Sequence, residues 1–279
     1  MSLTTFFQFA HTSYLPLPPT ATQRNAKAGY SPQVKLETVQ EIQARGKRTA
    51  VKLLHSPELM IMLNPLVQHY SRVDPADPAN EDRLVDLDTL ALKFNVALAN
   101  PLSCSSFADS KNGEFVHYEI IDKFQFLGGL ASKLLTYRAC FRPLYDVAPH
   151  TLPNGQPRES QGLETISDPG NGVSLLGKWV VSEDNQKPGF LVLTETVQVH
   201  CNVFLSWYVR GQLESAHAQL HKEFGRHFCE SMVAEDPMKG QDERVGKTWK
   251  EIRRSESAGS YTTTTNEVGN KPLDRMRTE

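Results

Sequence analysis

The order of patterns in the second half of the chain constrains the fold most, because several strand patterns lead into one long helical pattern. Three runs, at residues 162–167, 172–181 and 189–201, have the composition of β-strands. The turn sequences DPGN and EDNQKPG separate them at distances typical of hairpins. After Asn202 the apolar period becomes that of a helix. The sequence therefore predicts an antiparallel meander followed by one helix, which has to bury its apolar side against the sheet.

The expected helix runs from about residue 203 to 233 and carries a single apolar stripe. The members of this stripe recur every three or four residues: Leu205, Val209, Leu213, Ala216, Leu220, Phe224 and Phe228. A stripe of this length predicts burial along the whole helix.

Residues 114–145, EFVHYEIIDKFQFLGGLASKLLTYRACFRPLY, predict a further hairpin whose strands meet at Gly128 and Gly129. Strand alternation places one set of mostly apolar side chains toward the helix: Val116, Tyr118, Ile120, Asp122, Phe124 and Phe126, matched by Leu135, Tyr137, Ala139 and Phe141. The charged residues Glu119, Lys123, Arg138 and Arg142 fall on the outer face, where we expect them in solvent. Asp122 is the exception, because it shares the face of the aromatic residues.

The first half of the chain is less regular. Residues 3–17 predict a strand, residues 34–54 a helix, and Ser56-Pro57 the start of a second helix that ends at Asn64-Pro65, before a strand from residue 66. Residues 74–112 have no clean period except an amphipathic run near 84–96, and we interpret them as a surface insertion with one helix. We expect one domain over residues 1–233 and a disordered tail over residues 234–279, whose composition is polar and rich in Thr and charge.

Several of these segments resemble a known family. The sequences MLNPLV, YEIIDKFQFLGGLASKLLTYRACF, GKWVV and LTETVQVHCNVFLSWYVRGQLESAHAQL are similar to those of a fungal family of unknown function, itself similar to the START/SRPBCC helix-grip superfamily. The resemblance covers roughly residues 50–232, without the insertion. It implies an α+β helix-grip fold, in which a curved antiparallel sheet wraps the long C-terminal helix. It also implies binding or transfer of lipids and sterols, or cyclisation, isomerisation or dehydration of polyketide-like substrates, with no catalytic residue set to carry over.

Two carboxylates are the candidate catalytic residues. A sheet bent around a helix leaves an apolar cavity between the sheet and the helix, and strand alternation points the side chain of Asp122 into this cavity. Glu195 shares a face with Leu191, Leu193, Val197 and Val199, although Phe190, Val192 and Thr194 make the opposite face nearly as apolar. Burial would raise the pKa of either carboxyl toward a range useful for acid–base catalysis. Pairing with Arg210, Lys178 or a backbone donor is the structural alternative.

The candidate ligand-binding residues are the aromatic side chains expected to face the cavity: Tyr118, Phe124, Tyr137, Phe141, Trp179 and Trp207. For Trp207, packing under the sheet is an alternative role. His217 and His221 form an i, i+4 pair, but they lack the Glu and third ligand of a helical zinc site. We therefore expect them at the border of the stripe, with no metal bound.

Composition narrows the classes of partner. A formal net charge of −2 gives no cationic field for nucleic acid. No apolar run is long enough for a membrane span, and the four cysteines are spaced irregularly, as in a reducing cytosol. No phosphate-binding or nucleophile-elbow motif indicates a cofactor or a Ser hydrolase.

Three functions remain open. The first is cofactor-free binding of a hydrophobic small molecule (polyketide, terpenoid or lipid), in fungal secondary metabolism as the resemblance implies, with cyclase or isomerase activity. The second is a non-catalytic lipid or sterol carrier. The third is an interaction protein that acts through the insertion and the tail.

Overall fold

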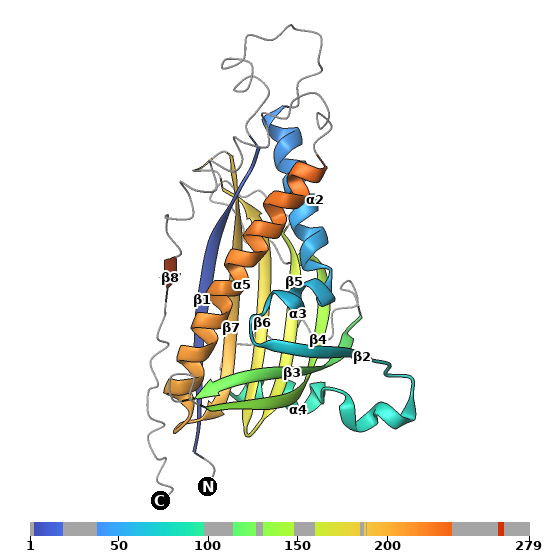
Figure 1. Ribbon diagram of the computed structural model, residues 1–279, viewed down its shortest axis with the longest axis vertical. Helices are drawn as coiled ribbons and strands as arrows, with labels where there is room; N and C mark the ends of the chain where they lie inside the picture. Colours follow the sequence, from blue (N-terminus) through green and yellow to red (C-terminus); the bar gives the residue numbers. More distant parts are fainter. Residues whose placement is uncertain are drawn as a thin grey trace, which may run out of the picture.

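The computed structural model of the chain describes residues 3–18, 38–97, 114–126, 131–147, 160–184, 187, 189–235 and 262–264. Within these ranges the protein is α+β, with one antiparallel sheet and a long C-terminal helix, as predicted (Figure 1). The Gly128-Gly129 turn and most of the expected tail lie outside the described residues.

The sheet is ordered β2-β3-β4-β5-β6-β7-β1-β8. Its strands are β1 (Thr4–Pro16), β2 (Val67–Val73), β3 (Val116–Phe126), β4 (Ala131–Val147), β5 (Ser160–Gly170), β6 (Val173–Glu183), β7 (Phe190–Asn202) and the three-residue β8 (Thr262–Thr264). From β2 to β7 the strands pair in chain order, whereas β1 pairs with β7 from Thr4↔Asn202 to Pro16↔Phe190. The sheet curves so strongly that β2 and β3 run across the direction of β6 and β7 in Figure 1.

Three helices cover the concave face of the sheet: α2 (Val39–Leu54), α3 (Pro57–Leu63) and α5 (Ser206–Ala234). Helix α2 begins at Val39 because Thr38 and Glu41 form a capping box, in which each side chain accepts a hydrogen bond from the other's backbone N–H. Helix α3 has Pro57 in its first turn and ends before Asn64, as predicted.

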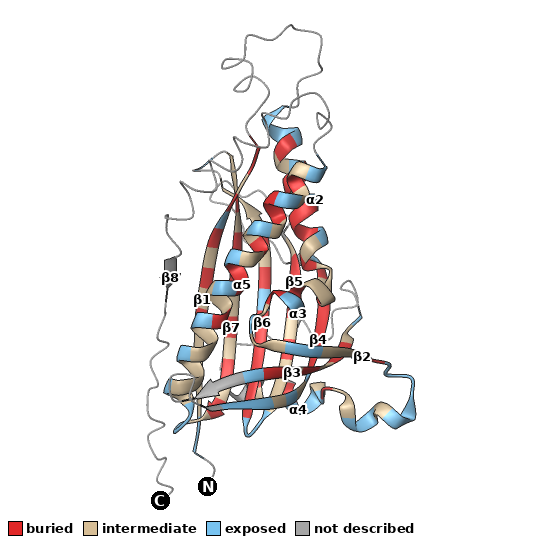
Figure 2. Cartoon of the chain, viewed as in Figure 1, coloured by how far each residue is buried: buried red, intermediate tan, exposed pale blue. Residues whose placement is uncertain are grey.

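The inner face and α5 form the main core. Along β7 the burial alternates without a break, so Leu191, Leu193 and Glu195 all point inward. Ala216, Leu220, Phe224 and Phe228 of the stripe are buried. Val209 and Leu213 are half-buried, and Leu205, which precedes α5, is exposed. Figure 2 shows the buried bands following the sheet and the upper turns of the helix. The stripe therefore anchors α5 most firmly in its C-terminal half.

The insertion at residues 74–112 contributes buried residues as well as surface. It carries the 3₁₀ helix η1 (Pro78–Arg83) and the one expected α-helix, α4 (Leu87–Ala97). Leu90 and Phe94 of α4 are buried against Cys140, Ile166 and Leu176 on the convex face of the sheet. Both faces of the sheet are thus covered over part of its width.

This covering corrects one expectation. Arg142 lies on the outer face as predicted, but it is buried rather than solvated, and its guanidinium forms an ion pair with the equally buried Glu164. The two residues stand directly opposite each other on β4 and β5. Phe115 lies under the guanidinium, 4.5 Å from its centre. Arg138 and Lys123 are exposed as expected.

Trp207 is a second correction, because its side chain is 77% exposed and cannot line an internal cavity. It follows Ser206 in the first turn of α5 and lies two residues before Val209 of the stripe. Two residues correspond to about 200° of helical rotation, which places Trp207 on the side of α5 away from the sheet. Neither proposed role for Trp207, cavity lining or core packing, fits its position.

Over the described residues, no helix has the length and apolarity needed to cross a membrane. Cys140, Cys201 and Cys229 are buried free thiols, as the irregular spacing of the cysteines predicted.

Candidate ligand cavity

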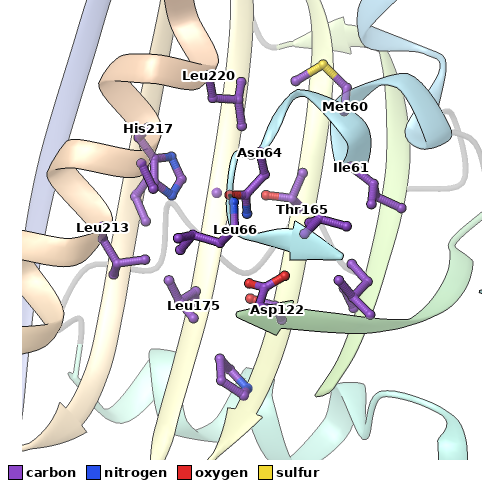
Figure 3. Close-up of a pocket in the computed structure, with 18 of the residues that line it drawn as sticks. Met60, Ile61, Asn64, Leu66, Asp122, Thr165, Leu175, Leu213, His217 and Leu220 are labelled. Carbon is purple, nitrogen blue, oxygen red and sulfur yellow. Dashed lines mark hydrogen bonds between the residues drawn. The ribbon is translucent and has the colours of Figure 1, made fainter. Parts of the chain in front are cut away.

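A cavity of about 140 Å³ lies between the concave face of the sheet and α5, and α3 with the segment after it closes one side (Figure 3). Most of its wall is apolar: Met60, Ile61, Leu66, Val67, Ile120, Phe141, Leu175, Trp179, Val197, Leu213 and Leu220. A smaller polar set also lines it: Asn64, Asp122, Tyr137, Thr165, Ser167, Glu195 and His217. The curved sheet wrapped around α5 thus leaves the kind of space that the sequence predicted.

A larger hollow of about 400 Å³ lies beside this cavity, at the N-terminal end of α5. The two spaces share part of their walls, namely Leu66, Pro169, Leu175 and Leu213. The hollow is also lined by Leu205, Tyr208 and Val209 of α5 and is mostly apolar. Its position beside the cavity gives a hydrophobic approach to the inner space.

Asp122 reaches the cavity from β3, where strand alternation placed it. Its side chain is buried, and Oδ2 accepts a hydrogen bond from the Tyr137 hydroxyl at 3.1 Å. Oδ1 has no hydrogen-bond partner among the described residues. Burial raises the pKa of this carboxyl to about 6, and the bond from Tyr137 opposes only part of that effect. The cations considered as partners, Arg210 and Lys178, do not pair with it.

Glu195 enters the cavity wall from β7 and is completely buried. Its Oε1 is 2.7 Å from Nδ1 of His217, and its Oε2 is 3.4 Å from Nε2 of His221, without hydrogen-bond geometry. Burial alone would raise the pKa of Glu195, but the adjacent His217 and His221 outweigh it and lower the pKa to about 2. Glu195 is therefore a carboxylate, paired with histidines rather than with Arg210 or Lys178.

Behind Glu195, His221 is fixed from two sides. Its Nδ1 is 2.9 Å from the Ser13 hydroxyl of β1, and its ring stacks on Trp179 with centroids 4.7 Å apart. Ser13 and Trp179 come from strands on either side of β7, so the sheet holds the ring from both neighbours. This arrangement gives the carboxylate a rigid environment.

His11 completes the group, because β1 places it directly opposite Glu195 in the sheet. Its ring is 5.6 Å from that of His221 and 6.3 Å from that of His217. Burial is the main cause that lowers the pKa of His11 to about 4; Glu195 opposes the shift and the two histidines add to it. His11 is consequently neutral above this pH.

Only some of the candidate ligand-binding residues line the cavity. Tyr137, Phe141 and Trp179 line the cavity. Tyr118 is buried outside its wall and donates a 2.5 Å hydrogen bond to Glu58 of α3, so it fastens that helix to the sheet. The side chain of Phe124 lies outside the described residues, and Trp207 is on the surface.

His221 is the residue that sequence reasoning misplaced. It is fully buried, whereas His217 is half-buried and lies at the border of the stripe as expected. A curved sheet covers a wider arc of a helix than a flat one, so residues beside the stripe become buried as well. Two signals were available: the i, i+4 spacing of the pair, and the alternation that puts His11 and Ser13 on the inward face of β1 with Phe9 and Leu15.

No group of three or more His, Cys, Asp or Glu side chains in the described ranges is arranged to hold a metal ion. The histidine nitrogens nearest Glu195 face its carboxylate oxygens rather than a common point. The chemistry that this arrangement supports is transfer of a proton.

Residues 44–151 match the family model described as Domain of unknown function (DUF7053). A comparison with curated proteins finds no match to the chain. The family match takes in the insertion, which the sequence resemblance had left out, and stops before β5, so Asp122 and Tyr137 lie within it while Glu195 and the histidines of α5 do not. The match therefore covers the part of the chain that supplies α3, β2, β3 and the Asp122 side of the cavity.

Proposed function

We propose that this protein binds a hydrophobic small molecule (a polyketide, a terpenoid or a lipid) in the cavity between the sheet and α5, without a cofactor, and isomerises or cyclises it. The fold would then be a helix grip of the START/SRPBCC kind, because the curved sheet and the long helix have that arrangement. The setting implied by the sequence resemblance is fungal secondary metabolism.

One observation carries the proposal: ionisable side chains line an internal space that is otherwise apolar. Proteins rarely bury carboxylates without a reason, since each costs free energy unless it is paired. Among the described residues, Asp122 is held by a single hydrogen bond, from Tyr137, and its raised pKa is typical of groups that exchange protons near neutral pH.

The size of the space suits a ligand with a ring. A dry cavity of about 150 Å³ in another protein accommodates benzene, and the inner cavity here measures about 140 Å³. The adjoining hollow of about 400 Å³ falls within the range of ordinary ligand pockets. A molecule that places one ring inside and the rest in the hollow would meet mostly apolar side chains.

The first experiment tests binding. Purified protein is incubated with a fungal lipid and metabolite extract, re-isolated, and the retained molecules are identified by mass spectrometry. Ala216→Leu fills space in the cavity wall and should abolish retention, whereas Ser215→Leu adds the same side chain at an exposed position of α5 and should not. Equal retention by both variants would place the ligand elsewhere and refute the proposal.

The carrier function is the second candidate, and the apolar hollow beside the cavity favours it. With the ligand known, Asp122→Asn separates the two functions, because it keeps the shape and removes the ionisable proton. In an enzyme this change should leave binding nearly intact and lower turnover about 100-fold or more. The matched control is Glu114→Gln, at an exposed position just before β3.

A further inference from the structure

Glu195 and His217 form a dyad whose geometry resembles the orienting pair of acid–base enzymes. Oε1 of Glu195 lies 2.7 Å from Nδ1 of the His217 imidazole and forms a hydrogen bond with it. Nε2 is therefore the ring nitrogen available to a ligand. Both residues line the cavity. A carboxylate at this position fixes the tautomer and stabilises the imidazolium that forms when Nε2 accepts a proton.

The carboxylate itself is held in place. Its second oxygen lies 3.4 Å from Nε2 of His221, and Ser13 holds the other nitrogen of that ring. Phe9 packs edge-on against the ring of His217, with centroids 5.6 Å apart. These contacts come from β1, β7 and α5, so the dyad is fixed by the body of the fold.

We propose that His217 is the general base of this cavity, that Glu195 is its positioning residue, and that Asp122 is the acid that acts on the same ligand. This inference rests on the proposed function and deepens it. Figure 3 shows His217 on α5 and Asp122 on β3 on different sides of the drawn cavity, which both line. A ligand lying between them would meet one group at each side.

Such a pair selects a chemical class of substrate: a hydrophobic ketone with a C–H bond next to its carbonyl group. Nε2 of His217 takes the proton from that carbon, and the electron pair of the C–H bond forms a C=C bond as the carbonyl π pair moves to oxygen. Asp122 in its protonated form, which predominates below about pH 6, passes its carboxyl proton to this oxygen and gives an enol.

Collapse of the enol completes the reaction. The oxygen returns its proton to Asp122, and the carbon chain takes a proton from His217 at the original or a conjugated position. In a ketone whose C=C bond lies one carbon further from the carbonyl, the net change is movement of that double bond into conjugation with the carbonyl, with no oxidant or reductant.

The probe is cyclohex-3-enone, a six-carbon ketone that matches the size of the inner cavity and isomerises to the conjugated cyclohex-2-enone. Its binding is measured by ligand-observed NMR, and its isomerisation by the absorbance of the conjugated product. The 279-residue chain should bind the probe and accelerate its isomerisation. His217→Ala and Asp122→Asn should each lower kcat about 100-fold or more, whereas His227→Ala, outside the cavity on the same helix, should leave kcat unchanged.

Two further measurements separate catalysis from a structural role. Imidazole added to the medium should restore turnover to His217→Ala and have no effect on the other variants. Glu195→Gln should lower kcat with little change in KM, as expected when an interaction that matters in the transition state is removed.

The outcomes are distinguishable. If wild type and Ala216→Leu bind the probe equally, the probe does not occupy the cavity, and both the proposed function and this inference are overturned. A probe that binds in the cavity without faster isomerisation, or an undiminished rate in His217→Ala, overturns the inference alone.

Discussion

Asp122→Asn should stabilise the protein at neutral pH, and the gain should depend on pH in a defined way. The pKa of the buried carboxyl is raised from 3.8 to about 6, so the folded state has to ionise a group that resists ionisation. At 1.36 kcal/mol for each pKa unit, the difference costs the folded state about 3 kcal/mol at pH 7. An amide has nearly the same shape, keeps an oxygen to accept the bond from Tyr137, and carries no charge.

The sign follows from the protons bound in each state. Below about pH 3.8 the carboxyl is protonated in both states, so its ionisation costs the fold nothing. Between about 3.8 and 6 the unfolded chain releases the proton while the folded protein retains it, so wild type loses stability as pH rises. Above pH 6 both states are ionised, and the difference between variant and wild type stays near its maximum.

Urea denaturation at intervals from pH 3.5 to 8 measures this difference as a free energy of unfolding. Subtracting wild type from variant cancels every other titrating group that the substitution leaves alone. Glu114→Gln, at an exposed position, is the control and should give a flat difference. A flat difference for Asp122→Asn as well would show that Asp122 is not held in an environment that disfavours its charge.

Three further predictions concern other parts of the fold. The buried His11 has a pKa lowered from 6.5 to about 4, so it opposes folding as pH falls from about 6.5 to 4, and His11→Gln should remove about 3 kcal/mol of that acid sensitivity in the same denaturation series. On α5, Phe224→Ala should cost about 3 to 5 kcal/mol in chemical denaturation, whereas Trp207→Ala should change stability by less than about 0.5 kcal/mol; equal effects would mean that the burial of the helix is misassigned. Replacing Arg142 by Met should cost about 3 to 5 kcal/mol because it removes the guanidinium from the buried Glu164, and additional replacement of that glutamate by Gln should recover part of the loss; a thermal melt that does not respond to the first change would contradict this.

The sequence predicted the meander, the long helix and the inward direction of Asp122 because each follows from a local period. For Glu195 alternation left two faces open, since both sides of that strand are apolar. Alternation along β3 and β7 needs no knowledge of the rest of the chain. The end of α3 before Asn64 and the start of α5 near residue 206 have similarly local causes. These features were predictable because neighbouring residues in the sequence determine them.

The partners of Glu195 could not be predicted in the same way. Ser13 and His221, which are in hydrogen-bond contact, are 208 residues apart in the chain, and only the packing of α5 on β1 brings them together. Burial of Arg142 likewise depends on what covers the convex face of the sheet. Alternation gave the correct face for Arg142, but the extent of coverage is a property of the whole fold.

The pairing of β1 with β7 also sets the order in which the protein can be made. The two strands join residues near 4 with residues near 202, and ribosomes add about 5 to 20 residues per second. The first strand therefore waits roughly 10 to 40 s for its partner, with the side chains of Phe9 and Leu15 lacking the neighbours that later bury them. Long-range pairing of this kind slows folding and exposes strands to aggregation. A cell that makes this protein has to protect β1 until β7 has been synthesised.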